Sequence, residues 1–247
     1  MTFDKNQTVR EIAIHNPATV RVFENFGIDY CCGGKRTLHE ACASVNAPID
    51  RVMEALGESE VNGISSEDAW TGRSFADLTA HIVRRHHRYV REECPRIELL
   101  LQKVVNRHGE AHPELGTIQD TFAALSQELF AHMMKEERVL FPFLEAMEAA
   151  ARAGRPAPLG CFASVELPIA RMLADHDDAG MLLAKMRDLS GDYRAPEGSC
   201  PSYRGLYRAL EEFERDLHHH VHLENNILFP RAVEMERSLK ETAHVSH

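Results

Sequence analysis

One eleven-residue motif occurs twice in the sequence, and this repeat constrains the fold more than any other feature. HMMKEERVLFP occupies 132–142 and HVHLENNILFP occupies 220–230, and the two agree without a gap at His, Glu, Leu, Phe and Pro. The copies are separated by 88 residues, and His87 and His176, which lie upstream of them, are separated by 89. We interpret this pattern as two related helical hairpins packed with pseudo-twofold symmetry.

Long amphipathic segments predict the helices that carry the repeat. The spacing of apolar residues predicts one helix from Ser74 onward and three more over 117–151, 164–189 and 202–237. Their short connections favour an antiparallel four-helix bundle, and strand signals are nearly absent. We therefore expect an all-α fold.

Upstream of the bundle, short helical stretches punctuated by Gly and Pro predict a small helical domain over 1–58, which contains Cys31 and Cys32. The polar segment 59–73 has the composition of a linker. We place the bundle at 74–237 and a tail without an assigned role at 238–247.

Composition argues against several classes of function. The formal net charge is −10 and the arginines are scattered among more numerous acids, which is not the pattern of a nucleic-acid-binding protein. No apolar run approaches the roughly 20 residues of a membrane helix, and the first residues lack the apolar core of a signal peptide. Six cysteines without a C-x-x-C motif are typical of a reducing compartment. We expect a cytoplasmic protein with neither a nucleic-acid nor a membrane partner.

The repeated motif has the chemistry of a metal site. Residues at i and i+4 share a helix face, so His132 with Glu136, and His220 with Glu224, each present a nitrogen beside a carboxylate. One such pair is more often a surface ion pair, but two copies inside amphipathic helices favour metal ligation. A carboxylate can span two cations, and imidazole suits iron, zinc, copper and nickel. One histidine from each remaining helix would complete a symmetric site for two metals.

Several histidines compete for these positions in the last helix. His222 lies about 200° around the helix from His220, and His218 and His219 have no counterpart in the first motif copy. We therefore expect His220 to face the site and its three neighbours to be solvated.

The remaining helices are less determined by pattern alone. His176 follows from the repeat offset. In the first helix, apolar periodicity favours His86, whereas the repeat offset slightly favours His87. His81 is a further candidate, although a lone histidine is more often a hydrogen-bonding core residue.

In combination, these motifs resemble the hemerythrin-like di-iron proteins called repair of iron centres. The resemblance covers about 9–232 and rests on DYCCGGK at 29–35, HIVRRHH at 81–87, HMMKEE at 132–137, DHDDAG at 175–180 and HVHLENNILFPRA at 220–232. It implies a hemerythrin-like bundle preceded by a small domain, and a non-haem centre of two iron ions per chain. Glu136 and Glu224 would bridge the irons, and the terminal ligands would be four histidines: His87, His132, His176 and His220. The resemblance thus favours His87 over His86.

The same resemblance implies repair of iron-sulfur clusters damaged by nitrosative or oxidative stress. Repair would proceed by iron donation, by nitric oxide binding and reduction to nitrous oxide, or by both, so nitric oxide reductase activity is an open expectation. Damaged iron-sulfur proteins, nitric oxide or oxygen, and a second copy in a homodimer are the expected partners. The alternatives are a hemerythrin-like protein that binds or senses oxygen or nitric oxide without turnover, and a ferritin-like oxidase, whose Glu-x-x-His motif is missing from the relevant helices.

Two adjacent thiols form the other chemical motif. Cys31 and Cys32 precede Gly33, Gly34, Lys35 and Arg36. A helix start and nearby cations can lower the pKa of a thiol. Adjacent cysteines often have no special role, but the resemblance favours catalytic thiols that handle electrons or iron. The other cysteines are expected to be structural: Cys42, Cys94, Cys161 and Cys200.

Overall fold

The computed structural model describes residues 3–61, 70–156, 158, 160 and 162–245, and within these ranges the chain folds into helices, turns and loops. An antiparallel bridge between Thr8 and Thr37 is the only β interaction among the described residues. The predicted all-α class is confirmed. Most of the expected linker (62–69) and Cys161 lie outside the described residues.

A small domain is formed by the first helices. Thr8 and Thr37 cap the first and third of these helices, each through a capping box with the glutamate three residues on, Glu11 and Glu40. The helices are α1 (Val9–His15), α2 (Thr19–Asn25), α3 (Leu38–Ser44) and α4 (Ile49–Val61). They enclose a separate apolar core that includes Val9, Ile12, Phe23, Leu38 and Leu56.

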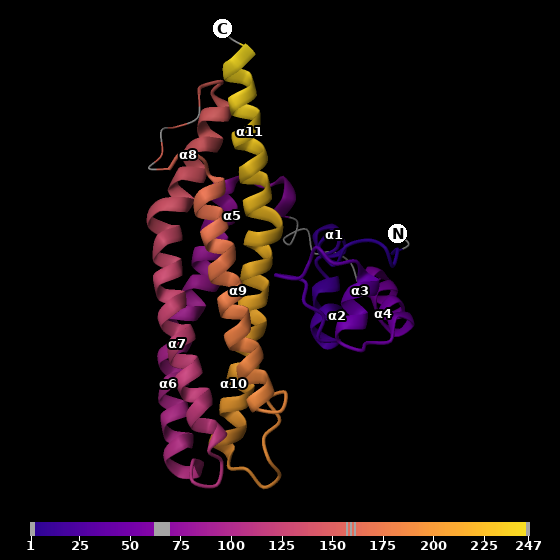
Figure 1. Cartoon of the computed structure of the whole chain (residues 1–247), viewed down its shortest axis with the longest axis vertical. Coiled ribbons are helices and arrows are strands. Elements are labelled where there is room, and N and C mark those ends of the chain that lie inside the picture. Colours follow the sequence, from indigo (N-terminus) through magenta and orange to yellow (C-terminus); the bar gives the residue numbers. More distant parts are fainter. Residues whose placement is uncertain (1–2, 62–69, 157, 159, 161, 246–247) are drawn as a thin grey trace.

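Four long helical rods form an antiparallel bundle, and the small domain lies beside it (Figure 1). After one short turn, η1 (Trp70–Gly72), the first rod is capped by Ser74, whose side chain accepts a hydrogen bond from the amide of Asp77. The rods are α5 (Phe75–Ile82), η2 (Val83–His87) and α6 (Arg88–His108); α7 (Glu114–Lys135), η3 (Glu136–Leu140) and α8 (Phe141–Arg152); α9 (Glu166–Leu189); and α10 (Pro201–His222), η4 (Leu223–Leu228) and α11 (Phe229–Val245).

The last rod is longer than the sequence pattern suggests. We expected it to end at Arg237, but α11 continues as helix to Val245. Much of the segment that was assigned as a tail therefore extends the bundle. Among the described residues, none of the helices combines the length and apolar character needed to cross a lipid bilayer.

Two apolar cores fill the bundle, one on each side of a buried polar layer. One core contains Ile97, Leu101, Phe122, Leu125 and Phe213, and the other contains Phe75, Leu78, Leu144, Leu228 and Phe229. The polar layer between them consists of His87, His132, Glu136, His176, His220 and Glu224, each of which is no more than 3% exposed. Burying so many polar groups is costly unless they are paired or bind a metal.

Three of the four rods change to a π-helical turn at this layer, at η2, η3 and η4. In both motif copies the turn ends at the Phe-Pro pair, and the amide of Phe141 or Phe229 donates to the carbonyl five residues back, that of Glu136 or Glu224. The following prolines have no amide hydrogen and cannot restore the i to i−4 ladder at that point. The repeated Leu-Phe-Pro thus explains the local geometry, which is frequent at functional sites.

The second motif copy also provides a docking point for the small domain. The Arg10 guanidinium donates to the carbonyl of Asn226 at 3.0 Å, and Pro230, four residues further on, has no amide hydrogen to compete for that carbonyl. The Asn226 side-chain amide in turn donates to the carbonyl of Tyr30 at 2.9 Å. The Tyr30 ring lies 5.4 Å from that of His222. These contacts hold the Cys-Cys turn against the bundle.

Candidate metal centre

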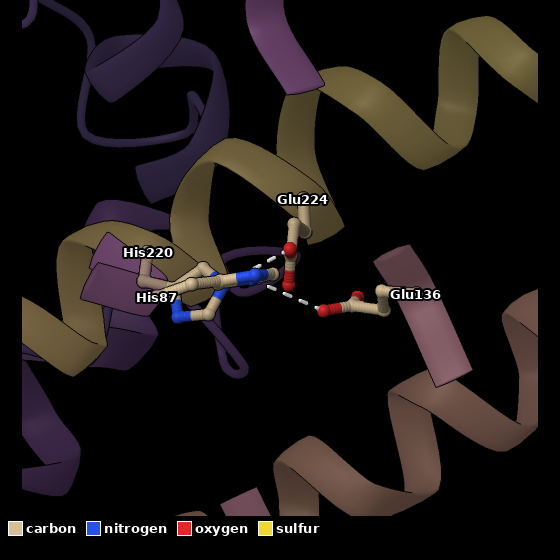
Figure 2. A group of neighbouring side chains, drawn as sticks. All are labelled: His87, Glu136, His220 and Glu224. Carbon is tan, nitrogen blue, oxygen red and sulfur yellow. Dashed lines mark hydrogen bonds and ion pairs between the residues drawn. The ribbon is translucent and has the colours of Figure 1, made fainter. Parts of the chain in front are cut away.

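The first half of the polar layer joins residues from three rods. His87 Nε2 lies 3.2 Å from His220 Nε2 and 3.4 Å from Glu136 Oε2, and His220 Nε2 lies 3.0 Å from Glu224 Oε1. Figure 2 shows these side chains converging, with the two imidazoles on one side and Glu136 reaching toward them from another rod. Their nitrogen and oxygen atoms lie within 4.8 Å of one another, close enough to hold one metal ion.

The second half repeats this arrangement. His176 Nε2 lies 3.1 Å from His132 Nε2 and 3.1 Å from Glu224 Oε2, and His132 Nε2 lies 3.3 Å from Glu136 Oε1. These four residues form a second group with the spacing of a metal site. The structure therefore brings together all six residues that the sequence singled out.

The two glutamates belong to both groups. Each turns one carboxylate oxygen toward each histidine pair, which is the geometry of a carboxylate that spans two cations. Burial opposes the ionisation of Glu224, but His220 and His176 outweigh it and lower the pKa of Glu224 well below its ordinary value. The pKa of Glu136 is also lowered, since His132 and His87 together outweigh burial and the repulsion from Glu224. Both carboxylates are thus anionic acceptors.

The histidines are oriented so that a cation fits between them. The Nδ1 atoms of His87, His132 and His176 lie 2.6 Å from Glu137 Oε1, 3.3 Å from Asp175 Oδ2 and 2.7 Å from Asn225 Oδ1. Because these partners accept hydrogen bonds, each Nδ1 carries a proton, and Nε2 is the ring nitrogen that faces the carboxylates and is available to a cation.

Although burial opposes it, the nearby Glu136 carboxylate raises the pKa of His87 above its ordinary value and that of His132 to about 9, so without a metal ion protons balance the buried carboxylates. A cation bound between the Nε2 atoms would take the place of these protons. In addition, both oxygens of Glu136 and Oε2 of Glu224 are buried without a hydrogen bond to any described residue. The donor set of imidazole nitrogens and carboxylate oxygens is one that iron accepts. The residues therefore fit a pair of metal ions.

Comparison with known proteins agrees with this geometry. Residues 78–232 match the family model described as hemerythrin HHE cation binding domain, and 5–60 match a domain of unknown function, DUF542. The chain belongs to the hemerythrin family. It is 35% identical over 232 residues to the iron-sulfur cluster repair protein YtfE of Yersinia pseudotuberculosis serotype IB (strain PB1/+), covering 94% of this chain and 99% of that protein. The YtfE proteins of Yersinia pestis (strain Pestoides F) and Yersinia pseudotuberculosis serotype O:1b (strain IP 31758) show the same coverage at 35% and 34% identity. A hemerythrin domain implies iron binding.

In this hemerythrin bundle, the choice between His86 and His87 depends on the π turn. Both side chains are buried, at 1% and 0% exposure, because η2 widens the helix where they occur. Only His87 reaches the metal-binding group. His86 Nδ1 instead lies 3.0 Å from Asp216 Oδ2. The periodicity that favoured His86 assumed a regular α-helix, which is not the geometry here.

The last rod departs from expectation at His222. We expected this side chain to be solvated, but it is 3% exposed and packs between Tyr30 and Asn226. Burial lowers its pKa to about 3, so it is neutral. The expectation was wrong because the small domain covers this face of the rod. His218 and His219 are half-buried rather than fully solvated.

The two adjacent thiols lie near the centre but outside both groups. Cys32 Sγ lies 4.0 Å from the carbonyl of His176, and the carbonyl of Cys31 lies 3.5 Å from the side-chain nitrogen of Asn225, the residue that orients His176. The expected low pKa is wrong for Cys31: a hydrogen bond to Cys32, burial and the nearby Asp29 carboxylate all raise its pKa. No helix begins at the pair, since α3 begins at Leu38.

Sequence reasoning missed the acceptors that orient the histidines. Glu137 and Asn225 occupy the same position in the two motif copies, one residue after the central glutamate. Their equivalence in the repeat was a signal that could have identified them. Asp175, which directly precedes His176, could not be identified in this way. The residue 89 positions earlier in the first half of the repeat is His86, not a second carboxylate.

Proposed function

We propose that this chain repairs damaged iron-sulfur clusters, as the names of its Yersinia relatives state for those proteins. The observation that carries the proposal is the pair of glutamates that each offer one oxygen to each histidine pair. This arrangement supports a non-haem centre of two iron ions, which the repair of an iron-containing cluster can draw on.

In this proposal the six buried residues have distinct roles. His87 and His220 would be terminal ligands of one iron, and His132 and His176 of the other. Glu136 and Glu224 would bridge the two and, being anionic, balance much of their charge. When bound, such a pair of irons supplies exchangeable metal, electrons and open positions for nitric oxide or oxygen.

The residues around the ligands would control how firmly iron is held. Glu137 is fixed by Arg91, whose guanidinium lies 2.7 Å from the oxygen that also contacts His87. Asp175 is fixed by Lys135 and Arg171. Such outer partners strengthen a histidine ligand and set its direction.

We assign Cys31 and Cys32 the handling of iron or electrons at the His176 side of the centre. A raised pKa keeps Cys31 protonated at rest, and coordination of an approaching metal ion deprotonates a thiol. All cysteines among the described residues are free thiols, which supports a role in a reducing compartment such as the cytoplasm.

Two readouts test the repair function. A [4Fe–4S] dehydratase inactivated by nitric oxide is incubated anaerobically with the iron-loaded protein, and its activity and the transfer of labelled iron are followed. We expect recovery with labelled iron in the rebuilt cluster, and no recovery with the Glu136→Ala, Glu224→Ala double variant.

The same samples are analysed for nitrous oxide after exposure to nitric oxide. Nitrous oxide formation by the reduced protein would add nitric oxide reduction to iron donation. Binding of nitric oxide without nitrous oxide, combined with no cluster recovery, would overturn the repair function in favour of a gas-binding protein.

A further inference from the structure

A group of arginines lies on the surface of the bundle beside the candidate metal centre. The segment 83–91 contains four arginines and no acidic residue, in a chain whose 38 acids outnumber its 28 Lys and Arg residues. Arg84, Arg88 and Arg91 have the i, i+4, i+7 spacing of one helix face, and all three are exposed. Arg138, on the next rod, is exposed as well. We define these four residues as the arginine face: Arg84, Arg88, Arg91 and Arg138.

The positive charge of the arginine face is only weakly neutralised. Arg88 pairs with Glu92 at 2.7 Å, but the two side chains are 72% and 58% exposed, so another carboxylate can readily replace this one. Arg84 and Arg138 form no ion pair within the part of the chain that the structure describes. The fourth arginine of the segment, Arg85, turns instead toward α10 and contacts an aspartate there at 3.4 Å.

Two hydrogen bonds join the arginine face to the candidate centre. The Arg91 guanidinium donates to Glu137 Oε1 at 2.7 Å, and the same oxygen accepts from His87 Nδ1 at 2.6 Å. Hydrogen bonds to ionised groups such as these are short and strong. A single carboxylate thus separates a surface arginine from a proposed iron ligand.

The sign of the charge determines what can dock at this surface. Positive charge repels metal cations and attracts acidic surfaces. The His176 side of the centre has the opposite character, because Asp177 and Asp178 directly follow His176 and are exposed. Cys32 Sγ lies on that side, 4.0 Å from the His176 carbonyl. Iron is therefore expected to pass on the thiol side, and the arginine face suits a partner other than a metal ion.

The proposed function requires a supply of electrons. Coupling two molecules of nitric oxide to nitrous oxide and water consumes two electrons and two protons, and ferric iron must be reduced before it can leave as ferrous iron. Cys31 and Cys32 can provide two electrons once, after which the pair must itself be reduced. An external electron donor is needed for repeated turnover.

We propose that the arginine face docks an acidic one-electron carrier protein, which reduces the iron centre across the Arg91–Glu137–His87 hydrogen bonds. Each transfer oxidises the carrier by one electron and converts one ferric ion of the centre to ferrous, and no bond is made or broken. Electron-transfer complexes have small interfaces and depend on opposite charges for fast association. The net charge of −10 disfavours an extended polyanion such as DNA on the same surface. The inference rests on the proposed function.

An acidic [2Fe–2S] ferredoxin is the probe for docking. The full iron-loaded chain and the ferredoxin, both oxidised, are titrated calorimetrically at low and high salt. We expect a complex that high salt weakens about tenfold or more, because salt screens exposed charges. At low salt, the Arg84→Glu, Arg88→Glu double variant should bind about tenfold or more weakly than the wild type, with the same iron content.

The Arg51→Glu, Arg237→Glu double variant is the matched control. It changes the net charge by the same amount, at arginines that are 76% and 61% exposed and lie on the small domain and on α11. It should bind the ferredoxin within about twofold of the wild type, because these sites are remote from the arginine face.

Electron transfer is measured by mixing the oxidised, iron-loaded protein with reduced ferredoxin in a stopped-flow instrument. At low salt, Arg84→Glu, Arg88→Glu should be reduced about tenfold or more slowly than the control variant. Photoreduced deazalumiflavin, which is small and uncharged, should reduce both variants at rates within about twofold of each other, since it needs no docking surface. Equal rates with ferredoxin would contradict the role of the arginine face.

The binding titrations also separate the ways in which the proposal can fail. A ferredoxin complex that is absent, insensitive to salt or unchanged in Arg84→Glu, Arg88→Glu overturns it, as does tighter binding of a short DNA duplex titrated in the same way. A wild-type chain that never retains iron would instead refute the iron centre. Because the arginine face contains no metal ligand, the metal-free chain should still bind the ferredoxin, so the two failures are distinguishable.

Discussion

Glu137 and Asn225 follow the central glutamates of the two motif copies, and each accepts a hydrogen bond from Nδ1 of a histidine on another rod. Glu137 Oε1 lies 2.6 Å from His87 Nδ1, and Asn225 Oδ1 lies 2.7 Å from His176 Nδ1. Each copy of the repeat thus carries the bridging carboxylate together with the group that orients a ligand on the other rod of the same hairpin.

Removing one of these acceptors should weaken one half of the centre. Asn225→Ala leaves His176 without its Nδ1 partner, and we expect about 10-fold to 100-fold weaker binding of the iron held by His132 and His176. The measurement is competition with a ferrous chelator under anaerobic conditions. Asn225→Asp keeps an acceptor at the same place and should retain more than half of that affinity. Equal iron affinity of wild type and Asn225→Ala would show that this contact does not tune the centre.

The contact between Asn226 and Tyr30 should control access to the buried thiol. Asn226→Ala removes the donor to the Tyr30 carbonyl, and leaving a buried carbonyl unpaired costs about 1–3 kcal/mol. We expect Cys31, 5% exposed in the structure, to react roughly tenfold faster with a maleimide in this variant. Mass spectrometry of the labelled peptide follows the rate. Asn6→Ala, at an exposed site in the small domain, is the control; acceleration of the same size there would refute the contact's role.

The apolar cores on either side of the polar layer should dominate stability. Leu125 is fully buried, and Leu125→Ala should lower the free energy of unfolding by about 2–5 kcal/mol because it leaves a cavity. Leu99 lies on the same bundle but is 68% exposed, so Leu99→Ala should change the free energy of unfolding by less than about 0.5 kcal/mol. Urea denaturation of the iron-loaded proteins measures both. Similar losses in the two variants would contradict the position of the core.

Removal of the metal should destabilise the whole bundle. Without cations, the converging Nε2 atoms and the buried carboxylates lose the metal ions to which we propose that they bind. An ion present at about 100 times its dissociation constant stabilises the folded state by about 2.7 kcal/mol. For a chain of this size that corresponds to a fall in Tm of roughly 5–10 °C after chelation. Differential scanning calorimetry before and after anaerobic chelation, with iron added back as control, tests this; an unchanged Tm would contradict a bound ion in the polar layer.

Much of the metal centre could be predicted from the sequence, because its ligands lie close together along the chain and occur in two copies. The i, i+4 spacing places His132 beside Glu136 and His220 beside Glu224, whatever the rest of the fold does. The repeat then predicts that the two pairs face each other. The four rods follow from apolar periodicity in the same way.

Other features depend on contacts that periodicity does not contain. The π turn at 83–87 buries His86 and His87 together, so the 3.6-residue period, which favours His86, does not identify the histidine that reaches the metal-binding group. His222 is buried by the small domain, whose Tyr30 packs against its ring and whose Arg10 donates to the carbonyl of Asn226. The hydrogen bond to Cys32, burial and the Asp29 carboxylate raise the pKa of Cys31, whereas the nearby cations in the sequence predict a lower pKa.

The most direct test of the central claim is anaerobic metal analysis combined with Mössbauer spectroscopy of the wild type and Glu136→Ala. Since Glu136 contributes one oxygen to each histidine pair, we predict about two irons per chain with coupled spins in the wild type. In Glu136→Ala, iron should be lost or the coupling abolished. Zinc in place of iron, or a coupled pair of irons that is indifferent to the loss of Glu136, would contradict the account.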